Sequence, residues 1–310
     1  MKTVGEARIW LKENLKTVYA SDELHEILFL VLNFVTQLMQ TQLHAFPKTQ
    51  LSEAQIRMLL LLAKKLQSGM PIQYALGETE FFGLKFEVNP SVLIPRPETE
   101  ELVVWVLEEK GSLNGDKRSG ERRKGNKDSE GLVNDEREKT ISILDIGTGS
   151  GCIPITIKKN WPEAEVSGLD ISAEALQTAK RNALLNKVEV QFFQQDILNF
   201  YPVKEALPYS IIVSNPPYIT QKEQKLMYNN VLDFEPHLAL FVPEDDPLLF
   251  YRAIANYASF MLQKNGLLFL EINEKFGLET VELLKQKGFV EVELRQDFRG
   301  KDRMVRGVKV

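Results

Sequence analysis

The chain has 310 residues, of which 44% are hydrophobic and 26% charged, and its formal net charge is −5. These values are typical of a globular protein long enough for two domains. No apolar run approaches the ~20 residues that span a bilayer, and the first residues lack a signal-peptide pattern, so we expect a cytoplasmic protein with no membrane contact. A single cysteine excludes an intramolecular disulfide, and three widely spaced histidines predict no metal site. The acidic balance argues against a generally basic surface for nucleic acid.

The first part of the chain, residues 1–72, predicts helices without strands. Apolar residues recur at helical intervals in 4–19 and form a longer run in 24–43. Ser52 is suited to cap a further helix, which Gly69 ends. The apolar faces are explained by burial against one another, so these residues predict a small helical domain.

Residues 73–97 change to short extended runs. Residues 80–83 and 84–88 are typical of a β-hairpin with Gly83 between its strands, and a proline-rich stretch follows. The segment predicts a linker between two domains. The second domain, 98–310, then opens with a helix whose first turn is acidic.

Residues 109–139 are almost devoid of apolar side chains. Such a stretch cannot bury enough surface to offset the entropy of ordering it, so we predict a disordered insertion. Its basic residues 122–124 leave contact with RNA as an alternative, but a solvated insertion is the preferred interpretation.

From residue 141 onward, strand patterns alternate with helix patterns. Alternation of this kind predicts an α/β fold with a mostly parallel sheet and helices on both faces. The expected strands are 142–145, 165–170, 188–193, 210–214, 266–272, 290–294 and 303–310. The expected helices are 173–185, 251–262, 278–287 and one that follows the glycines after the first strand.

A glycine-rich loop follows the first of these strands. Glycines at alternate positions let the backbone turn tightly and approach a ligand, and the helix that follows offers free N–H groups. The spacing differs from the G-x-G-x-x-G of nicotinamide-binding folds. The candidate loop residues are Gly147, Thr148, Gly149, Ser150 and Gly151.

Two further turns complete a nucleoside-like site. Asp170 ends the second strand, where an acidic side chain is suited to accept hydrogen bonds from two ribose hydroxyls. Asp196 and Ile197 follow the third strand, where a carboxylate suits an exocyclic amino group and an isoleucine covers a base. Both residues are equally suited to turn and packing roles, and that alternative stays open. Ser172 is a candidate helix cap.

The tetrapeptide Asn215-Pro216-Pro217-Tyr218 follows a buried strand. Neither proline donates to a strand ladder and both fix φ, so the turn is stiff. The asparagine side chain and the next carbonyl then lie close together, with an aromatic ring nearby, which suits a planar amide or amino group. A plain loop is the alternative, and the position after a strand of an α/β fold favours a ligand site.

Residues 145–151 with Asp170 resemble a class I S-adenosylmethionine-dependent methyltransferase, and Asn-Pro-Pro-Tyr resembles the motif by which amino and amide methylases hold their target. Further segments narrow the resemblance to the peptide chain release factor glutamine N5-methyltransferase (PrmC/HemK) family, which it covers over nearly the whole chain. These segments are 71–74, Gly77, 80–84, 92–100 and 234–236.

The resemblance implies a Rossmann-like methyltransferase domain with a mostly parallel seven-stranded sheet, a small all-helical N-terminal domain and a β-hairpin linker. It implies S-adenosyl-L-methionine as cofactor, with S-adenosyl-L-homocysteine as product. The implied protein substrate is a class I release factor, methylated on the glutamine of its Gly-Gly-Gln loop. The same resemblance implies a monomer that requires no direct contact with nucleic acid for its activity. The implied catalytic residues are Asn215, Pro216, Pro217 and Tyr218, and Asn215 joins the cofactor-binding set.

The chain also departs from the family pattern. The insertion at 109–139 is longer than usual, a tryptophan often found beside the adenine is missing, and residues 242–247 replace a glycine-rich stretch. Arg96, Glu98 and Glu100 are suited to contact a partner, but ion pairs between domains are the preferred interpretation.

Three alternatives stay open beside the release-factor interpretation. An N6-adenine methylase of nucleic acid would use the same Asn-Pro-Pro-Tyr on an exocyclic amine, but should carry a basic recognition region. A glutamine methylase acting on a ribosomal protein shares the motif. A non-enzymatic scaffold would bind the nucleoside without methyl transfer.

Overall fold

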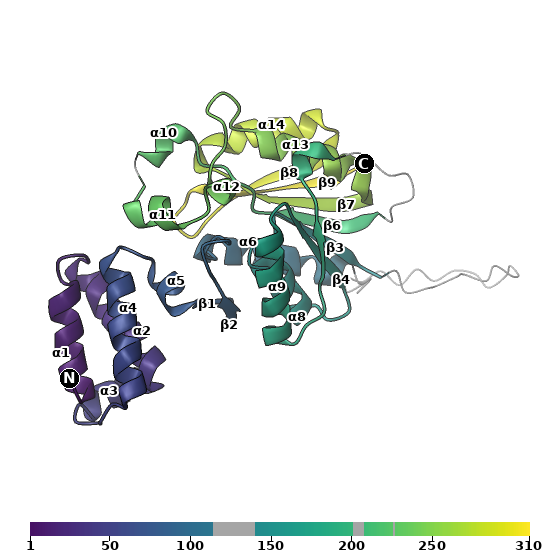
Figure 1. Cartoon of the computed structure of the whole chain (residues 1–310). Helices are drawn as coiled ribbons and strands as arrows, with labels where there is room; N and C mark the ends of the chain where they lie inside the picture. Colours follow the sequence, from purple (N-terminus) through teal and green to yellow (C-terminus); the bar gives the residue numbers. More distant parts are fainter. Residues whose placement is uncertain (114–139, 201–207, 226) are drawn as a thin grey trace, which may run out of the picture.

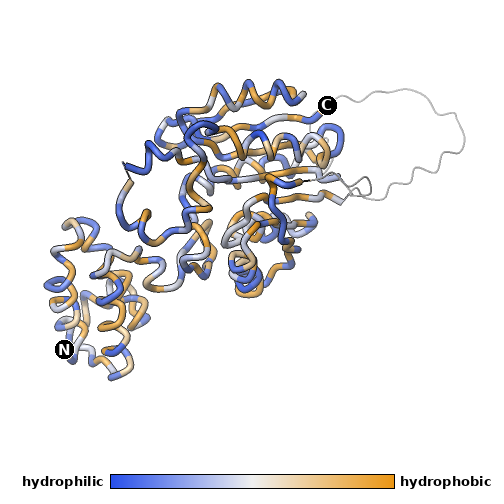
Figure 2. Tube along the Cα trace, turned by 45° about the horizontal axis from the view of Figure 1, so that its top comes forward, coloured by the Kyte–Doolittle hydropathy of each residue, from blue (hydrophilic) through white to orange (hydrophobic). Residues whose placement is uncertain are grey.

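The computed structural model describes residues 1–113, 140–200, 208–225 and 227–310. Its N-terminal helices lie to one side of the molecule, away from the large sheet (Figure 1). These helices are α1 (Val4–Leu15), α2 (Ser21–Thr36), α3 (Gln40–Ala45), α4 (Glu53–Gln67) and α5 (Ile72–Leu76). Each carries hydrophobic and hydrophilic residues (Figure 2). The hydrophobic ones pack into a core of their own, which includes Leu11, Val31 and Leu59.

Helix ends follow local capping chemistry. The Ser52 hydroxyl accepts the Gln55 N–H at 3.2 Å, so the predicted cap of α4 is confirmed. The apolar run 24–43 is helical as expected, and it is divided between two helices. Gln37 takes the left-handed conformation with φ of 60° and ends α2, and α3 starts three residues later.

The predicted hairpin is confirmed, with β1 (Glu78–Phe81) antiparallel to β2 (Leu84–Glu87). Phe82 and Gly83 form its two-residue turn, and both have positive φ, 54° and 70°, as a type I′ turn requires. The hairpin is fixed to α9 (Ala173–Asn186), because the Asn182 side chain exchanges two hydrogen bonds with the backbone of Glu87, at 2.6 and 2.9 Å.

The described residues form a seven-stranded sheet in the order β5-β4-β3-β6-β7-β9-β8, which confirms the predicted α/β fold. Strands β3 to β7 are parallel to one another, and β9 is antiparallel to both β7 and β8. The strands are β3 (Ser142–Ile146), β4 (Glu165–Asp170), β5 (Gln191–Gln194), β6 (Tyr209–Ser214), β7 (Leu262–Glu271), β8 (Phe289–Gln296) and β9 (Asp302–Lys309).

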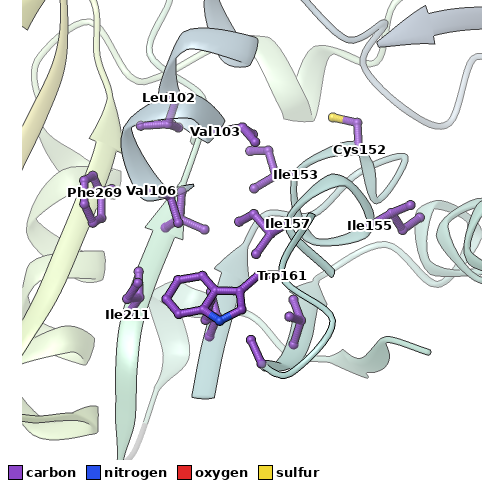
Figure 3. Packing of buried hydrophobic residues seen from close by; sticks show 14 of the residues in the cluster. Leu102, Val103, Val106, Cys152, Ile153, Ile155, Ile157, Trp161, Ile211 and Phe269 are labelled. Atoms are coloured by element: carbon purple, nitrogen blue, oxygen red, sulfur yellow. The ribbon is translucent and has the colours of Figure 1, made fainter. Parts of the chain in front are cut away.

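Helices cover both faces of the sheet, as the sequence predicts. One face packs against α6 (Pro97–Glu108), α8 (Cys152–Asn160) and α9, and the other against α13 (Leu249–Met261) and α14 (Gly277–Gln286). Side chains along the central strands alternate between the two cores, so Ile211 lies in the first and Ile212 in the second. Figure 3 shows the first core, where Val106 of α6 and Ile157 of α8 lie near Trp161.

Short helices that the sequence did not predict follow the central strands. They are α10 (Gln221–Gln224), α11 (Asn229–Phe234), α12 (His237–Leu240) and the 3₁₀ turns η1 (Ile197–Asn199) and η2 (Glu274–Phe276). The first residues of the predicted disordered insertion are helical instead, because α7 (Lys110–Leu113) continues after α6. The remainder of that prediction, including the basic residues 122–124, lies outside the described residues. Within the described residues, the helices are all too short or too polar to cross a membrane.

Candidate active site

A cavity of about 310 Å³ lies at the carboxyl ends of the central strands. Strand β3 has β4 on one side and β6 on the other, so the chain reverses its direction of progress across the sheet at β3. Ligands of open α/β sheets bind at this kind of switch point, and the volume is within the usual range of small-molecule sites. The cavity is therefore the candidate active site.

The glycine loop forms the floor of this cavity between β3 and α8. Gly147, Gly149 and Gly151 all have positive φ, from 53° to 80°, a conformation that side chains strain. The N–H groups of Gly147 and Thr148 both donate to the Leu169 carbonyl at 2.9 Å, which ties the loop to β4.

Four of the five predicted loop residues line the cavity, and Gly151 does not. Gly151 caps α8, and a side chain there would meet Ile155 at 2.9 Å and Ala179 at 3.1 Å. Its glycine is therefore required for the packing of α8 against α9.

Asp170 lines the cavity at the end of β4. One carboxylate oxygen accepts the Gly149 N–H at 2.8 Å, and the other accepts the Ser172 N–H at 2.9 Å. Burial raises the pKa of Asp170, although these backbone donors act in the opposite direction. The carboxylate is thus held in one orientation by the backbone, with lone pairs left for a ligand. Ser172 caps α9 as predicted.

Beneath the loop, Asp145 and Thr148 are buried polar residues. The carboxylate oxygens of Asp145 and the Thr148 hydroxyl make no hydrogen bond within the described residues. Burial raises the pKa of Asp145 to about 7, the adjacent Thr148 hydroxyl acts in the opposite direction without reaching good hydrogen-bond geometry, and the nearby Asp170 charge adds to the rise. Unpaired buried polar atoms are costly, and they are typical of a site that a polar ligand completes.

Asp196 and Ile197 also line the cavity, but Asp196 has structural partners. Its carboxylate accepts the Leu198 N–H at 2.9 Å and the Asn199 side-chain amide at 2.6 Å, so it caps η1. Ile197 and Leu198, together with Ile171 beyond Asp170, give this end of the cavity an apolar wall. The turn role that the sequence left open for Asp196 is thus present.

Asn215, Pro216 and Pro217 line the cavity from the end of β6, and Tyr218 does not. The Asn215 side-chain NH₂ donates to the Thr99 hydroxyl at 3.1 Å. The Tyr218 hydroxyl donates to Glu271 at 3.1 Å, and burial raises the pKa of Tyr218 well above its ordinary value. Tyr218 therefore anchors the turn from behind.

Sequence reasoning missed several residues of the site. Thr99 lines the cavity from α6, and Glu271 of β7 lies behind it. In the sequence, Glu271 is visible only as a carboxylate at the end of a buried-strand pattern. Thr99 is visible only as a polar residue early in an apolar helix. Apolar lining from the linker and α13 was also missed, namely Val92, Leu93, Pro95, Phe250 and Ile254.

An ion pair fixes the linker over the cavity. Arg96 contacts Glu235, which is buried, at 2.5 Å, and Glu235 also accepts the Ile94 N–H at 3.3 Å. The preferred interpretation of Arg96 as a bridging ion pair agrees with this contact. Glu98 pairs with Arg299 at 3.8 Å, and Glu100 accepts the Phe82 N–H at 2.6 Å.

The fold and the cavity at its switch point define a class I methyltransferase. Comparison with known proteins agrees: residues 127–233 match the family described as Methyltransferase small domain, and residues 6–77 match PrmC N-terminal domain. A release factor glutamine methyltransferase of Flavobacterium psychrophilum is 41% identical, covering 94% of each chain. One of Bacteroides thetaiotaomicron is 37% identical over 96% of each chain, and one of Bacillus subtilis is 32% identical over 98% of this chain and 97% of its own. The chain belongs to the release factor glutamine methyltransferase family.

S-adenosyl-L-methionine is the cofactor of this enzyme. The cavity fits it chemically, because a backbone-held carboxylate for hydroxyl groups lies beside an apolar wall for an adenine ring. The buried Asp145 carboxylate is close enough to Asp170 for their charges to interact, although it does not line the cavity. Among the described residues, no cluster of histidine, cysteine or acidic side chains is arranged to hold a metal ion.

Proposed function

We propose that the chain transfers a methyl group to the side-chain nitrogen (N5) of the glutamine in the Gly-Gly-Gln motif of class I release factors. The observation that carries the proposal is the orientation of Asn215. One N–H of its NH₂ group donates to the Thr99 hydroxyl, which turns the side-chain oxygen away from Thr99 and leaves that oxygen free to accept a hydrogen bond at the cavity. An acceptor oxygen there suits the N–H of an amide substrate.

Asn215 and Pro216 act by placing the substrate amide. An amide nitrogen is a poor nucleophile because its lone pair is delocalised into the carbonyl. When the Asn215 oxygen and the Pro216 carbonyl each accept one N–H of the glutamine, the lone pair points across the cavity. These hydrogen bonds strengthen as positive charge develops on the nitrogen, so they favour the transition state over the bound substrate. Pro217 keeps the turn rigid, and Tyr218 supports it from behind.

Bound S-adenosyl-L-methionine supplies an electrophilic methyl group on a positively charged sulfur. We assign Gly147, Thr148, Gly149 and Ser150 to its amino-acid portion. Asp170 binds the ribose hydroxyls in this assignment. Ile197 covers the adenine in place of the missing tryptophan, and Asp196 keeps its capping role while it lines the same wall. No general base is needed, because a methylated, positively charged amide loses its proton readily.

We further propose that residues 1–72 dock the release factor, with 73–97 as the linker to the methyltransferase domain 98–310. The support is a pair of exposed apolar side chains on one side of α4, Met58 and Leu61, which lie three residues apart and are 41% and 50% exposed. Introducing a charge on this helix by Leu61→Asp should raise the KM for the release factor and leave the cofactor affinity unchanged. An unchanged KM would remove the docking role.

We propose that the enzyme acts as a monomer in the cytoplasm without nucleic acid. The support is the net charge of −5, which disfavours binding to phosphate backbones. Size-exclusion chromatography with light scattering tests the monomer, and addition of RNA to the methylation reaction tests the nucleic acid.

The decisive experiment is a parallel assay with methyl-labelled cofactor. The wild-type protein is incubated separately with a release factor, the same factor with its Gly-Gly-Gln glutamine changed to alanine, a ribosomal protein and an adenine-containing DNA. We expect label only in the first reaction, on the glutamine. Label in the ribosomal protein or the DNA would identify a different acceptor, and binding of cofactor without any transfer would indicate a scaffold.

A further inference from the structure

The orientation of Asn215 is set by a chain of hydrogen bonds that begins outside the Asn-Pro-Pro-Tyr turn. The Asn215 NH₂ donates to the Thr99 hydroxyl at 3.1 Å, and that hydroxyl donates to a Glu271 oxygen at 2.7 Å. Thr99 and Glu271 are almost fully buried, at 2% and 1% exposure. The three residues come from the turn after β6, from α6 and from β7, so the hydrogen bonds join three separate parts of the fold.

Which atoms donate and which accept in this series of hydrogen bonds follows from the chemistry of the Glu271 carboxylate. Above a pH of about 7 the Glu271 carboxylate is ionised and only accepts hydrogen bonds, so the single proton of the Thr99 hydroxyl is then committed to Glu271. The hydroxyl oxygen can then only accept, and it can accept only from the NH₂ side of Asn215. The Asn215 oxygen is therefore turned away from Thr99, and the amide lines the cavity.

The same carboxylate also holds the far end of the turn. Its second oxygen accepts the Tyr218 hydroxyl at 3.1 Å. Strand pairing explains the geometry, because Ser214 of β6 pairs with Leu270 of β7 and this register brings Glu271 beside the start of the turn. One buried group on β7 thus ties down Asn215 through Thr99 and Tyr218 directly.

We propose that Glu271 and Thr99 are positioning residues that fix the amide of Asn215 with its oxygen toward the substrate nitrogen. The inference rests on the proposed function, because it assigns the acceptor that holds the glutamine amide. Neither residue touches the substrate in this role. Both act through Asn215.

The environment of Glu271 is consistent with a role of this kind. Burial raises the pKa of Glu271 to about 7, although hydrogen bonds from Thr99 and Tyr218 and the charge of Arg303 act in the opposite direction. Arg303 forms its ion pairs with Asp297 and Glu274, so it does not neutralise Glu271 by direct contact. A buried carboxylate without an ion pair is costly for stability, which favours a role in the site.

The first test compares two substitutions of Thr99. Thr99→Val removes the hydroxyl at nearly constant volume, and Thr99→Ser keeps it. We expect kcat of Thr99→Val to fall by about 10- to 100-fold, as for losses of supporting hydrogen bonds around a site. The KM for the release factor and the cofactor Kd should stay unchanged, and Thr99→Ser should restore kcat. The matched control is Thr156→Val, because Thr156 is also buried but its hydroxyl has no partner in the described residues. It should keep the wild-type kcat.

The second test reverses the donor and acceptor roles in the series of hydrogen bonds from Asn215 to Glu271. In Glu271→Gln the new NH₂ group can donate to Thr99, which frees the threonine proton for Asn215 and favours rotation of its amide. We expect a loss of kcat similar to that of Thr99→Val, again without a change in cofactor Kd. The two losses should not add in the double variant, because both act through one amide.

A spectroscopic measurement separates this inference from the proposed function. With ¹⁵N-labelled protein, the side-chain resonances of Asn215, assigned through Asn215→Ala, should show one proton protected from exchange in the wild type and none protected in Thr99→Val. A wild type that methylates no glutamine would overturn the proposed function alone. Equal kcat in wild type and Thr99→Val, equal loss in Thr99→Ser, or unprotected Asn215 protons in the wild type would each overturn the positioning role.

Discussion

The two ends of the cavity are built in different ways. At the cofactor end, Asp170 is held by backbone N–H groups of Gly149 and Ser172, which lie 21 and 2 residues away in the chain. At the acceptor end, Asn215 and Tyr218 are held by side chains 116 and 53 residues away. The cofactor end therefore depends on local chain geometry, whereas the acceptor end depends on the completed fold. Substitutions should accordingly affect binding at one end and chemistry at the other.

The largest effect is expected for Asn215→Ala. The substitution removes the oxygen that we propose accepts the substrate N–H, a contact expected to strengthen in the transition state. We expect kcat to fall by about 10³-fold, as when one such preorganised contact is removed elsewhere. Cofactor affinity, measured by calorimetry, should stay close to the wild-type value. Methyl transfer at the wild-type rate would contradict the assignment of the acceptor end.

The difference between the two ends also explains what the sequence could predict. The glycine loop and Asp170 were identified because their neighbours in the chain already carry the geometry. The Asn-Pro-Pro-Tyr turn was identified because two prolines stiffen it locally. Thr99 and Glu271 were missed because only the pairing of β6 with β7 and the packing of α6 bring them to Asn215. The split between α2 and α3 was missed because Gln37 has no residue-type preference that marks a left-handed helix end.

A pH titration of stability compares the buried acids of the two ends. Burial raises the pKa of Glu271 from its ordinary 4.5 to about 7 and that of Asp145 from 3.8 to about 7. Each carboxyl group therefore binds its proton more tightly in the folded protein than in the unfolded chain. The stability they contribute is fully present below about pH 4 and is lost as pH rises through about 7. At 1.36 kcal/mol for each pKa unit, the loss is about 3 kcal/mol for Glu271 and about 4 kcal/mol for Asp145.

Urea denaturation between pH 4 and 8 measures this loss, and Glu271→Gln and Asp145→Asn should each flatten the profile. The gain in stability at pH 8 should be larger for Asp145→Asn, because the Asp145 carboxylate has the Thr148 hydroxyl as its neighbour without good hydrogen-bond geometry, whereas Glu271 accepts two well-formed hydrogen bonds. If the free energy of unfolding depends on pH in the same way in the wild type and both variants, burial does not raise the cost of ionising either acid.

Asp170→Ala should affect the cofactor end alone. The substitution removes the carboxylate assigned to the ribose hydroxyls and the acceptor of the Gly149 N–H. We expect the cofactor Kd to rise by about 100-fold, equivalent to roughly 2.7 kcal/mol. The kcat at saturating cofactor should change much less. The control is Asp196→Ala, whose partners in the cavity wall are its own turn residues. An equal loss of affinity in both variants would place the ribose contact elsewhere.

Gly151→Ala gives the smallest of these effects and tests whether the cofactor end depends on backbone shape. Gly151 has φ of 80°, and a Cβ there would meet Ile155 at 2.9 Å and Ala179 at 3.1 Å. Conformational strain and this clash together should lower the free energy of unfolding by about 2 kcal/mol, measured in urea. Gly69→Ala is the matched control, because Gly69 has φ of 82° with no atom within 4 Å of the added Cβ. It should lose about 1 kcal/mol, from strain alone.

The two variants should also differ in cofactor binding. Because the added Cβ of Gly151→Ala shifts α8 away from α9, this variant should bind the cofactor more weakly, whereas Gly69→Ala should bind it normally. Equal losses of stability in the two variants would mean that close packing of α8 against α9 contributes nothing to the cofactor end.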